Sequence, residues 1–407
     1  MTEELGEKML AVILSPLYFF GTWLIAFMFW RLLKAISEKL NRGVVKLAVG
    51  LVFGLASALL PIGFFLPEGK VKYLLQHWGS AWMGFLMFSM APAFLYLIYC
   101  LIWKICKRRN GVTEGMKRSR VVAIAAATVG AAFTLIAGFV GIVNATKIET
   151  TRYFVTAEKK SSKLDDLKIV MAADMHMGVN IGVPEMRKML ASINACEPDI
   201  VVFCGDIFDN NYEALDDPEE LKSILKSIKS KYGVFACYGN HDIKEPVLAG
   251  FTFDPDGVKE SDPRMDALLE EAGVKLLMDE AVLIDDSFYV YGRPDYAKPG
   301  RGIAQRKSAK ELMAELGSDY PVIVLDHEPR EQKELAEAGV DIDLCGHTHD
   351  GQIFPATIIV NLVYDNAYGL KKYGNMSNIV TSGVGLFGPY MRVGTIAEIC
   401  EIEVSFK

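Results

Sequence analysis

The chain has 407 residues, 51% of them hydrophobic, and a formal net charge of −7. Residues 1–150 hold 16 Lys and Arg against 7 Asp and Glu, whereas residues 151–407 hold 27 against 43. The acidic second part disfavours DNA and RNA as partners, because a polyphosphate backbone repels it. The 7 Cys include no CxxC pair, which excludes a disulfide scaffold and a zinc ribbon. We therefore expect two unlike domains, 1–150 and 151–407.

Four apolar stretches fill the first domain, and each is long enough to cross about 30 Å of hydrocarbon as a helix. We predict transmembrane helices at about 9–30, 47–66, 79–103 and 121–145. No acidic residue lies within these stretches. A transporter or channel normally carries buried ionisable groups, so we interpret the first domain as a membrane anchor.

The Lys and Arg residues of the connecting loops predict the orientation of the anchor. The first loop has five and the third has seven, whereas the second has only Lys70 and Lys72. Loops one and three should face the cytoplasm, and an even number of spans then places the second domain outside. Five further Lys and Arg lie at 147–163, after the last span, and they would suit an anionic inner leaflet equally well.

Beyond residue 165, short β-branched runs alternate with helical segments, which is the pattern of a layered α/β domain. We expect strands at 168–172, 200–204, 234–237, 288–291, 322–325, 342–345, 378–381 and 397–404. Helices are expected at 184–195, 218–231, 263–272, 309–316 and 330–338. The first three helices begin with Pro, which is favoured in the first helical turn.

Polar residues follow these strands at their carboxyl ends, where open α/β sheets gather ligands. Five of the six His of the chain lie there, a placement that packing alone does not explain. The groups are Asp174-Met175-His176, Gly205-Asp206, Gly239-Asn240-His241-Asp242, His327 and Gly346-His347-Thr348-His349. Each group alone is common as a turn or as a core residue, but the whole set at strand ends indicates a metal site.

This ordered set, with Asp209 added, resembles the signature of the calcineurin-like metallophosphoesterases over about residues 165–407. The segments Gly351-Gln352-Ile353 and Gly383-Val384-Gly385, with Arg392, are similar to the membrane-associated YkuE-like branch of bacteria, although Asp350 stands where that branch usually has Gly. The resemblance implies a four-layer α/β/β/α sandwich preceded by the four-helix transmembrane region. Together with the four spans and the Lys and Arg of the loops, it implies a multi-pass protein of the bacterial cytoplasmic membrane, with an extracytoplasmic catalytic domain.

The resemblance further implies two divalent metal ions. The ligands would be Asp174, His176 and His349 for one ion and Asn240, His327 and His347 for the other, with Asp206 bridging the two. Nitrogen and oxygen ligands without Cys suit Mn, Fe, Zn or Ni about equally.

Two such ions, about 3.5 to 4 Å apart, convert a bridging water into a hydroxide that attacks phosphorus in line. His241 is adjacent to a ligand but is not needed as one, so we expect it to protonate the leaving group. The resemblance suggests that Asp209 orients the His241 ring. Arg293, Arg301 and Arg392 are candidates for contact with the phosphate.

We therefore expect a membrane-anchored phosphoesterase that hydrolyses phosphodiester, pyrophosphate or phosphomonoester bonds. The anchor confines the site to the headgroup layer, so a membrane lipid or a lipid-linked phosphoester is the expected substrate. The alternative is a non-catalytic membrane receptor or scaffold that uses the same fold as a binding module. The sequence leaves open the metal, the native substrate, the class of ester and the oligomeric state.

Overall fold

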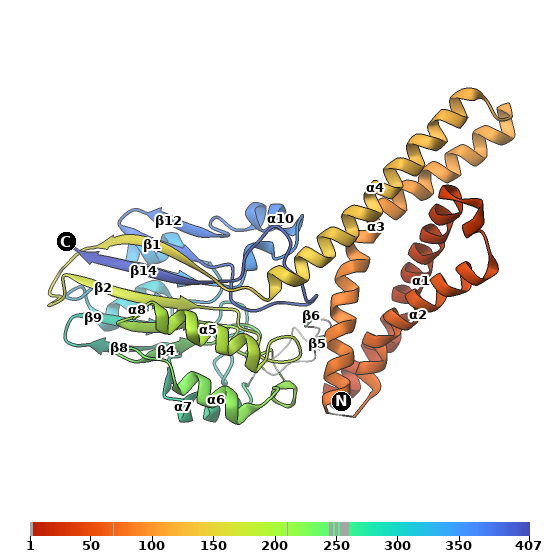
Figure 1. Cartoon of the computed structure of the whole chain (residues 1–407). Coiled ribbons are helices and arrows are strands. Elements are labelled where there is room, and N and C mark those ends of the chain that lie inside the picture. Colours follow the sequence, from red (N-terminus) through yellow and green to blue (C-terminus); the bar gives the residue numbers. More distant parts are fainter. Residues whose placement is uncertain (1–2, 68, 210, 244–246, 249–250, 253–259) are drawn as a thin grey trace. The chain divides into compact units, whose positions relative to one another are not determined.

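The computed structural model describes every residue except 1–2, 68, 210, 244–246, 249–250 and 253–259 (Figure 1). Its contacts divide the chain into two compact units. The first unit comprises Met1–Val143 with Gly388–Met391, and the second comprises Asn144–Phe387 with Arg392–Lys407. The first unit is built from long helices, and the second is a mixed α/β domain.

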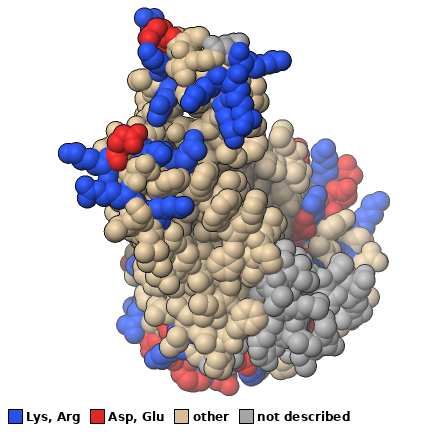
Figure 2. All heavy atoms as spheres, turned by 90° about the vertical axis from the view of Figure 1, so that its right-hand side faces the viewer, with Lys and Arg blue, Asp and Glu red and all other residues tan. Residues whose placement is uncertain are grey.

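The helical unit contains four long helices and one short 3-10 helix: α1 (Glu3–Ile36), η1 (Glu38–Leu40), α2 (Gly43–Phe65), α3 (Lys70–Asn110) and α4 (Glu114–Ala145). All four long helices are apolar enough to cross a membrane. Helix α3, with 41 residues, extends past the predicted span at both ends, because good helix formers such as Lys and Arg continue it. Figure 2 shows Lys and Arg gathered at one end of these helices, above a broad surface without charged side chains.

The α/β unit contains two six-stranded sheets. The first has the order β1-β14-β2-β3-β4-β7, with β1 (Glu149–Ala157), β2 (Asp166–Ala172), β3 (Ile200–Cys204), β4 (Val234–Cys237), β7 (Val274–Leu276) and β14 (Glu398–Phe406). The second has the order β12-β13-β11-β10-β9-β8, with β8 (Glu280–Ile284), β9 (Phe288–Gly292), β10 (Val322–Leu325), β11 (Ile342–Cys345), β12 (Gly369–Tyr373) and β13 (Met376–Val380). A separate hairpin pairs β5 (Val247–Leu248) with β6 (Phe251–Thr252).

Six α-helices accompany the sheets: α5 (Val183–Ala195), α6 (Pro218–Lys226), α7 (Pro263–Glu271), α8 (Ala309–Leu316), α9 (Gln332–Ala338) and α10 (Ala356–Val363). Two 3-10 turns, η2 (Tyr212–Ala214) and η3 (His349–Gly351), complete the described elements. Helices α5 to α7 each bury one apolar stripe, such as Met186, Met189 and Ile193 on α5.

The main core lies between the two sheets, because it draws buried side chains such as Val202 and Ile402 from the first sheet and Leu325 and Leu344 from the second. A second core lies where Leu312 of α8 and Leu335 of α9 pack on the other face of the second sheet. Strand β3 is buried at all five positions, as expected for a parallel strand inside a sandwich. This arrangement confirms the predicted fold class, an α/β sandwich preceded by four long apolar helices.

Candidate metal centre

The candidate site lies in the loops that follow the carboxyl ends of β2, β3, β4, β10 and β11. Strands β2, β3 and β4 are parallel neighbours in one sheet, and β10 and β11 are parallel neighbours in the other. The two sheets face each other across the core, so loops from both converge at one edge of the sandwich. The five His and three Asp that follow these strands therefore come together although up to 175 residues separate them in the sequence.

The backbone at this edge is held in an uncommon conformation. Five of the seven predicted ligand residues have a positive φ between 47° and 71°, namely Asp174, His176, Asp206, His347 and His349. Non-glycine residues rarely adopt this left-handed conformation, and it costs about 1–3 kcal/mol at each position. Such strain persists only where the surrounding structure enforces it, and it is concentrated at functional sites.

Two glycines of the motifs are required because the chain passes so close to a ligand side chain. A Cβ atom at Gly239 would lie 2.3 Å from Asp206 Oδ1, and one at Gly346 would lie 2.6 Å from Asp174 Oδ2. Any larger residue at either position would displace the carboxylate. The glycines therefore allow the two carboxylates to sit deep within the site.

A first group of donors is formed by Asp174, His176 and His349, which are all buried. The Nε2 atoms of His176 and His349 lie 3.0 Å apart, and His349 Nε2 lies 3.7 Å from Asp174 Oδ1. The backbone N–H of His347 donates to Asp174 Oδ1 at 2.9 Å and so fixes the carboxylate. One cation between these atoms would meet two imidazole nitrogens and one carboxylate oxygen.

A second group is formed by Asp206, His327 and His347, with Asn240 beside it. Asp206 Oδ2 lies 3.1 Å from His327 Nε2, and Asn240 Oδ1 lies 2.9 Å from His347 Nδ1. The other ring nitrogen of His327 faces the carbonyl oxygen of Cys204 at 3.0 Å, which orients the ring. Asp206 Oδ2 is also 3.6 Å from His176 Nε2, so this carboxylate lies between the two groups.

His241 and Asp209 lie beside the first group, and with His176 they form a third cluster of possible metal ligands. Asp209 Oδ1 is 3.4 Å from His241 Nδ1 and 3.6 Å from His176 Nδ1, so one carboxylate faces two imidazoles. These distances are longer than ordinary hydrogen bonds, and catalytic contacts of this kind often shorten when substrate binds. The backbone N–H of His241 donates to Asp206 Oδ1 at 2.7 Å, which ties the His241 loop to the shared carboxylate.

The electrostatics of the site show that the donors fit divalent cations. Burial raises the pKa of Asp174 to about 6, and burial together with the neighbouring His327 lowers the pKa of His347 to about 4. Burial acts against the charged form of His327 as well, but Asp206 beside it raises the His327 pKa well above its usual value. The negative charge of Asp206 thus favours a protonated His327 ring, and burial disfavours the charged form of Asp174. Divalent ions would neutralise these carboxylates while the imidazoles stay neutral, as metal ligation requires.

Two of the three predicted phosphate-contacting arginines lie in buried networks, which corrects that prediction. The Arg293 side chain has no exposed surface and donates to Asp326 Oδ2 at 2.9 Å and to Glu331 Oε2 at 2.8 Å. Arg392 is equally buried. Arg301 is partly exposed, and its Nε lies 3.5 Å from Asp266 Oδ2, so a role at the phosphate stays a prediction for this residue alone.

Arg392 holds the loop that supports Asp174. Its guanidinium donates to the carbonyl oxygens of Ser382, Gly383, Gly385 and Ile396 at 2.7–3.0 Å. The same loop donates its Gly385 N–H to the Asp174 carbonyl at 2.8 Å. The sequence analysis predicted that Arg392 contacts the phosphate. In the structure its guanidinium instead binds backbone carbonyls of a loop beside the site.

We expect Arg392→Met to destabilise the protein, because it leaves four buried carbonyls without their donor. The loss should be about 3–5 kcal/mol, which lowers the melting temperature of the detergent-solubilised chain by several degrees or more. Thermal unfolding followed by tryptophan fluorescence or circular dichroism measures it. An unchanged melting temperature combined with a raised KM for phosphoester would instead show that Arg392 contacts substrate.

Three further residues shape the site: Phe387 and Glu328 were not predicted, whereas Asp242 belongs to the predicted Gly239-Asn240-His241-Asp242 group. The Phe387 ring lies against the rings of His241, His176 and His349, with centroids 5.5–6.3 Å apart. Asp242 accepts the N–H groups of Phe208 and Gly239, both at 2.8 Å, so it fixes the loop that carries Asn240. Glu328 Oε1 lies 3.9 Å from His347 Nε2. Of the two residues that were not predicted, Glu328 carries a sequence signal, because it directly follows His327.

Comparison with known proteins agrees with this geometry. Residues 167–351 match the calcineurin-like phosphoesterase family. The chain is 27% identical to a transmembrane protein with metallophosphoesterase domain from Danio rerio, over 79% of this chain and 73% of that protein. It is 32% identical to a metallophosphoesterase of Campylobacter jejuni over 60% of each chain, so it spans about three fifths of the length of that relative.

Two other relatives carry more specific names. The chain is 28% identical to the metallophosphoesterase YkuE of Bacillus subtilis, over 59% of this chain and 79% of the relative. It is 24% identical to UDP-2,3-diacylglucosamine pyrophosphatase LpxG of Chlamydia trachomatis, over 55% of this chain and 76% of the relative. The predicted resemblance is thus confirmed, and the chain contains a calcineurin-like metallophosphoesterase domain, preceded by four helices of membrane-spanning length.

Proposed function

We propose that the protein is a membrane-anchored, two-metal phosphoesterase that acts on a lipid-linked phosphoester at the bilayer surface. The observation that carries the hydrolytic part is the convergence of seven donor side chains into two groups that share Asp206. In this proposal Asp174, His176 and His349 hold one divalent ion, and Asn240, His327 and His347 hold the other. The set contains no Cys and leaves Mn, Fe, Zn or Ni as candidates.

Two bound ions supply an activated water and neutralise charge on the phosphate oxygens. The residues of the chain supply the remaining chemistry. Asp209 faces His241 Nδ1, so a proton on that atom is held, and Nε2 is the atom that delivers a proton to the leaving-group oxygen. Burial is the largest single influence on the pKa of His241 and lowers it, but Asp206 and Asp209 together outweigh burial and raise the pKa above its usual value, which keeps a proton available on the ring.

Helix α10 supports a lipid as the substrate. The helix has the sequence Ala-Thr-Ile-Ile-Val-Asn-Leu-Val and buries none of its residues. Four of its large apolar side chains are more than half exposed, and Leu362 is 82% exposed. The preceding Phe354 is exposed as well. A contiguous apolar patch of this kind is rare on a water-soluble surface and is typical of a membrane or acyl-chain contact.

The apolar patch is adjacent to the donor groups at both of its ends. At its start, α10 packs on η3, which begins with His349. At its end, the ring of Tyr364 lies 5.9 Å from the ring of His347, and the Tyr364 hydroxyl donates to Glu328 Oε1 at 3.2 Å. An acyl chain lying along α10 would therefore bring its headgroup to the two groups of ligands.

The comparisons support the same class of substrate. LpxG is named for the pyrophosphate of a diacylated sugar nucleotide, a lipid-linked phosphoester. We extend this class to the present chain, and we include phosphodiester, pyrophosphate and phosphomonoester bonds. The distribution of Lys and Arg favours an extracytoplasmic phosphoesterase domain, and the similarity to YkuE of Bacillus subtilis supports a multi-pass protein of the bacterial cytoplasmic membrane.

We expect Leu362→Ser to weaken hydrolysis of a lipid while sparing hydrolysis of a soluble ester. Burial of one Leu side chain contributes roughly 1.5–3 kcal/mol, so the KM for CDP-diacylglycerol in mixed micelles should rise about tenfold or more. The kcat/KM for bis(p-nitrophenyl) phosphate should change less than about twofold, because that substrate has no acyl chain to lose. Steady-state kinetics of the Mn-loaded full chain measure both values.

Leu370→Ser is the matched control, because Leu370 is an exposed Leu on β12 of the same domain. It should leave both substrates unaffected. If the two variants have the same KM for the lipid, α10 does not contribute to lipid binding. Absence of turnover with every phosphoester, combined with retained lipid binding by metal-loaded protein, would favour the receptor or scaffold instead.

A further inference from the structure

The helical unit contains a second polar site, remote in sequence from the metal centre. A cavity of about 270 Å³ lies between α1, α3 and α4. We call it the basic pocket, and it is lined by Trp30, Arg31, Lys34, Ala35, Tyr96, Tyr99, Cys100, Trp103 and Arg120. Three of these nine residues are cationic and four are aromatic, and none is acidic.

The cations of the basic pocket are held over aromatic rings. Lys34 Nζ lies 6.0 Å from the centre of the Trp30 ring, and Arg120 Cζ lies 6.0 Å from the centre of the Trp103 ring. Within the part of the chain that the structure describes, Arg31, Lys34 and Arg120 form no ion pair with a carboxylate. Three positive charges at one end of the helical unit are therefore available to bind an external anion.

Two buried donors in the same pocket also lack an acceptor. The indole Nε1 atoms of Trp30 and Trp103 are both buried, and neither has a hydrogen-bond partner among the described residues. An indole N–H is a donor only, so an acceptor oxygen would be needed to satisfy it. Both atoms are closed off from solvent in this structure, so it is the three cations without a carboxylate partner that indicate an oxyanion such as a phosphate group.

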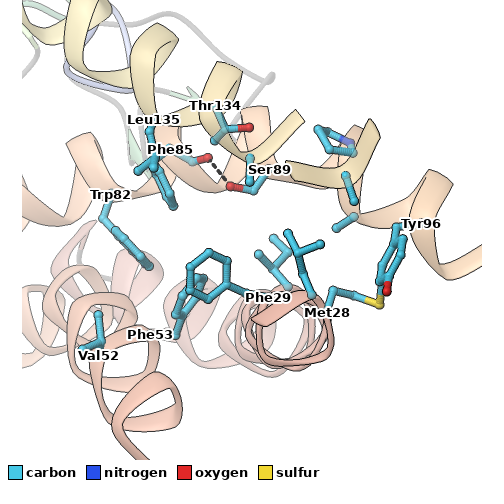
Figure 3. Close-up of a pocket in the computed structure, with 16 residues that line it drawn as sticks. Met28, Phe29, Val52, Phe53, Trp82, Phe85, Ser89, Tyr96, Thr134 and Leu135 are labelled. Carbon is cyan, nitrogen blue, oxygen red and sulfur yellow. Dashed lines mark hydrogen bonds between the residues drawn. The ribbon is translucent and has the colours of Figure 1, made fainter. Parts of the chain in front are cut away.

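A second, apolar cavity of about 310 Å³ adjoins the basic pocket at Tyr96, which lines both (Figure 3). We call it the apolar cavity. Figure 3 shows the rings of Phe29, Phe53, Trp82 and Phe85 around it. Its Ser and Thr hydroxyl groups are occupied: Ser89 donates to the Phe85 carbonyl at 2.9 Å and Thr134 donates to the Gly130 carbonyl at 3.0 Å. The apolar cavity therefore presents hydrocarbon to its contents, next to a pocket that suits an anion.

The basic pocket lies at the end of α4 opposite to the one that leads to the phosphoesterase domain. Arg120 belongs to the early turns of α4, and the helix ends at Ala145. About 25 residues at 1.5 Å per residue give roughly 37 Å between them, close to the thickness of a bilayer. Loops one and three, which are rich in Lys and Arg, lie at this same end. By the distribution of positive charge, this end faces the cytoplasmic leaflet, where anionic lipids are abundant.

We propose that the helical unit binds one anionic glycerophospholipid, with its phosphate in the basic pocket and an acyl chain in the apolar cavity. Both cavities are close to the lower limit of ordinary ligand pockets, roughly 300–1,000 Å³, and together they fall within that range. The bound lipid is distinct from the substrate, because the two ends of α4 lie at opposite faces of the membrane. It would act as a resident lipid that fixes α1, α3 and α4 against one another.

The test is native mass spectrometry of the full chain, delipidated in detergent and titrated with phosphatidylglycerol or phosphatidylcholine. We expect one tightly bound phosphatidylglycerol, with an apparent Kd at least about tenfold below that for phosphatidylcholine. The double variant Arg31→Gln/Arg120→Gln should abolish this preference. Arg109→Gln/Arg118→Gln removes the same charge from α3 and α4 at the same end of the helical unit, outside the pocket, and should retain the preference.

A second variant keeps the test decisive if the double variant does not fold. Ala131→Phe fills the apolar cavity without touching the cations and should also reduce phosphatidylglycerol binding about tenfold. Equal binding of phosphatidylcholine, unchanged binding by both variants, or displacement of the lipid by glycerol 3-phosphate at millimolar concentration would each overturn the proposal. Asp206→Asn should keep the lipid, so failure here is distinguishable from failure of the proposed phosphoesterase function.

Discussion

Asp206→Asn is expected to abolish stable metal binding and to lower turnover on the order of 10³-fold or more. The reason is that Asp206 Oδ2 lies between His327 Nε2 at 3.1 Å and His176 Nε2 at 3.6 Å, so it is the one carboxylate shared by both groups of donors. An amide has the same shape but no charge, so two cations held by these groups would lose their common anion. Metal ions contribute several kcal/mol to such a reaction, and their loss has a correspondingly large effect.

Elemental analysis of the Mn-loaded, desalted protein, with turnover of bis(p-nitrophenyl) phosphate beside it, measures both effects. Asp343→Asn is the matched control. Asp343 is a fully buried carboxylate on β11 that accepts a hydrogen bond from Asn378 at 2.9 Å, and burial raises its pKa to about 7. This control should keep its metal. Full metal occupancy in Asp206→Asn would contradict the bridging role.

His241→Ala is expected to keep its metal and to lose turnover about 100-fold or more, which is the usual contribution of a positioned general acid. His241 stands outside the two groups of donors that share Asp206, and its Nδ1 faces Asp209 at 3.4 Å. The ring therefore has a positioned Nε2, although His241 also lies close enough to His176 and Asp209 to form a third cluster of possible ligands with them. Asp209→Asn should show the same pattern with a smaller loss, because the ring keeps its place but loses its orienting anion.

The leaving group provides the readout that separates acid catalysis from a structural effect. p-Nitrophenolate leaves without protonation, whereas an alkoxide requires it. His241→Ala should therefore lose more activity toward an alkyl phosphodiester than toward a p-nitrophenyl diester. Equal losses on both substrates, or a metal content as low as that of Asp206→Asn, would show that His241 serves the metal centre and not the leaving group.

Much of the fold could be predicted from the sequence where a strand is buried on both faces. The runs 200–204, 234–237, 322–325 and 342–345 coincide with β3, β4, β10 and β11, because an uninterrupted apolar run bounded by polar residues has few other interpretations. Helix α6 was predicted to end at 231 but ends at Lys226, because the backbone N–H of Ser227 donates to carbonyls of the last turn and caps the helix there. Strands β1, β7, β8 and β12 were missed, since their half-exposed, mixed sequences carry little signal.

The donor residues of the site could be predicted because each follows a strand that ends at the same edge. The arginines could not, because a guanidinium has the same sequence signature whether it meets a phosphate or backbone carbonyls. Arg392 shows this: its partners are carbonyls of a loop whose conformation only the folded chain defines. The exposure of the apolar side chains of α10 could not be predicted either, because the composition of residues 356–363 is the same as that of a buried helix.

Strand β1, the first strand after the four long helices, determines where the chain can be cut to give a water-soluble phosphoesterase domain. Strand β1 begins at Glu149, four residues beyond the end of α4, and pairs along its whole length with β14, from Glu149 beside Glu398 to Ala157 beside Phe406. A water-soluble version trimmed to the family match, which starts at residue 167, would bare the edge of β14 and invite intermolecular sheet pairing. A water-soluble version should therefore begin within residues 146–148, so that β1 stays paired with β14.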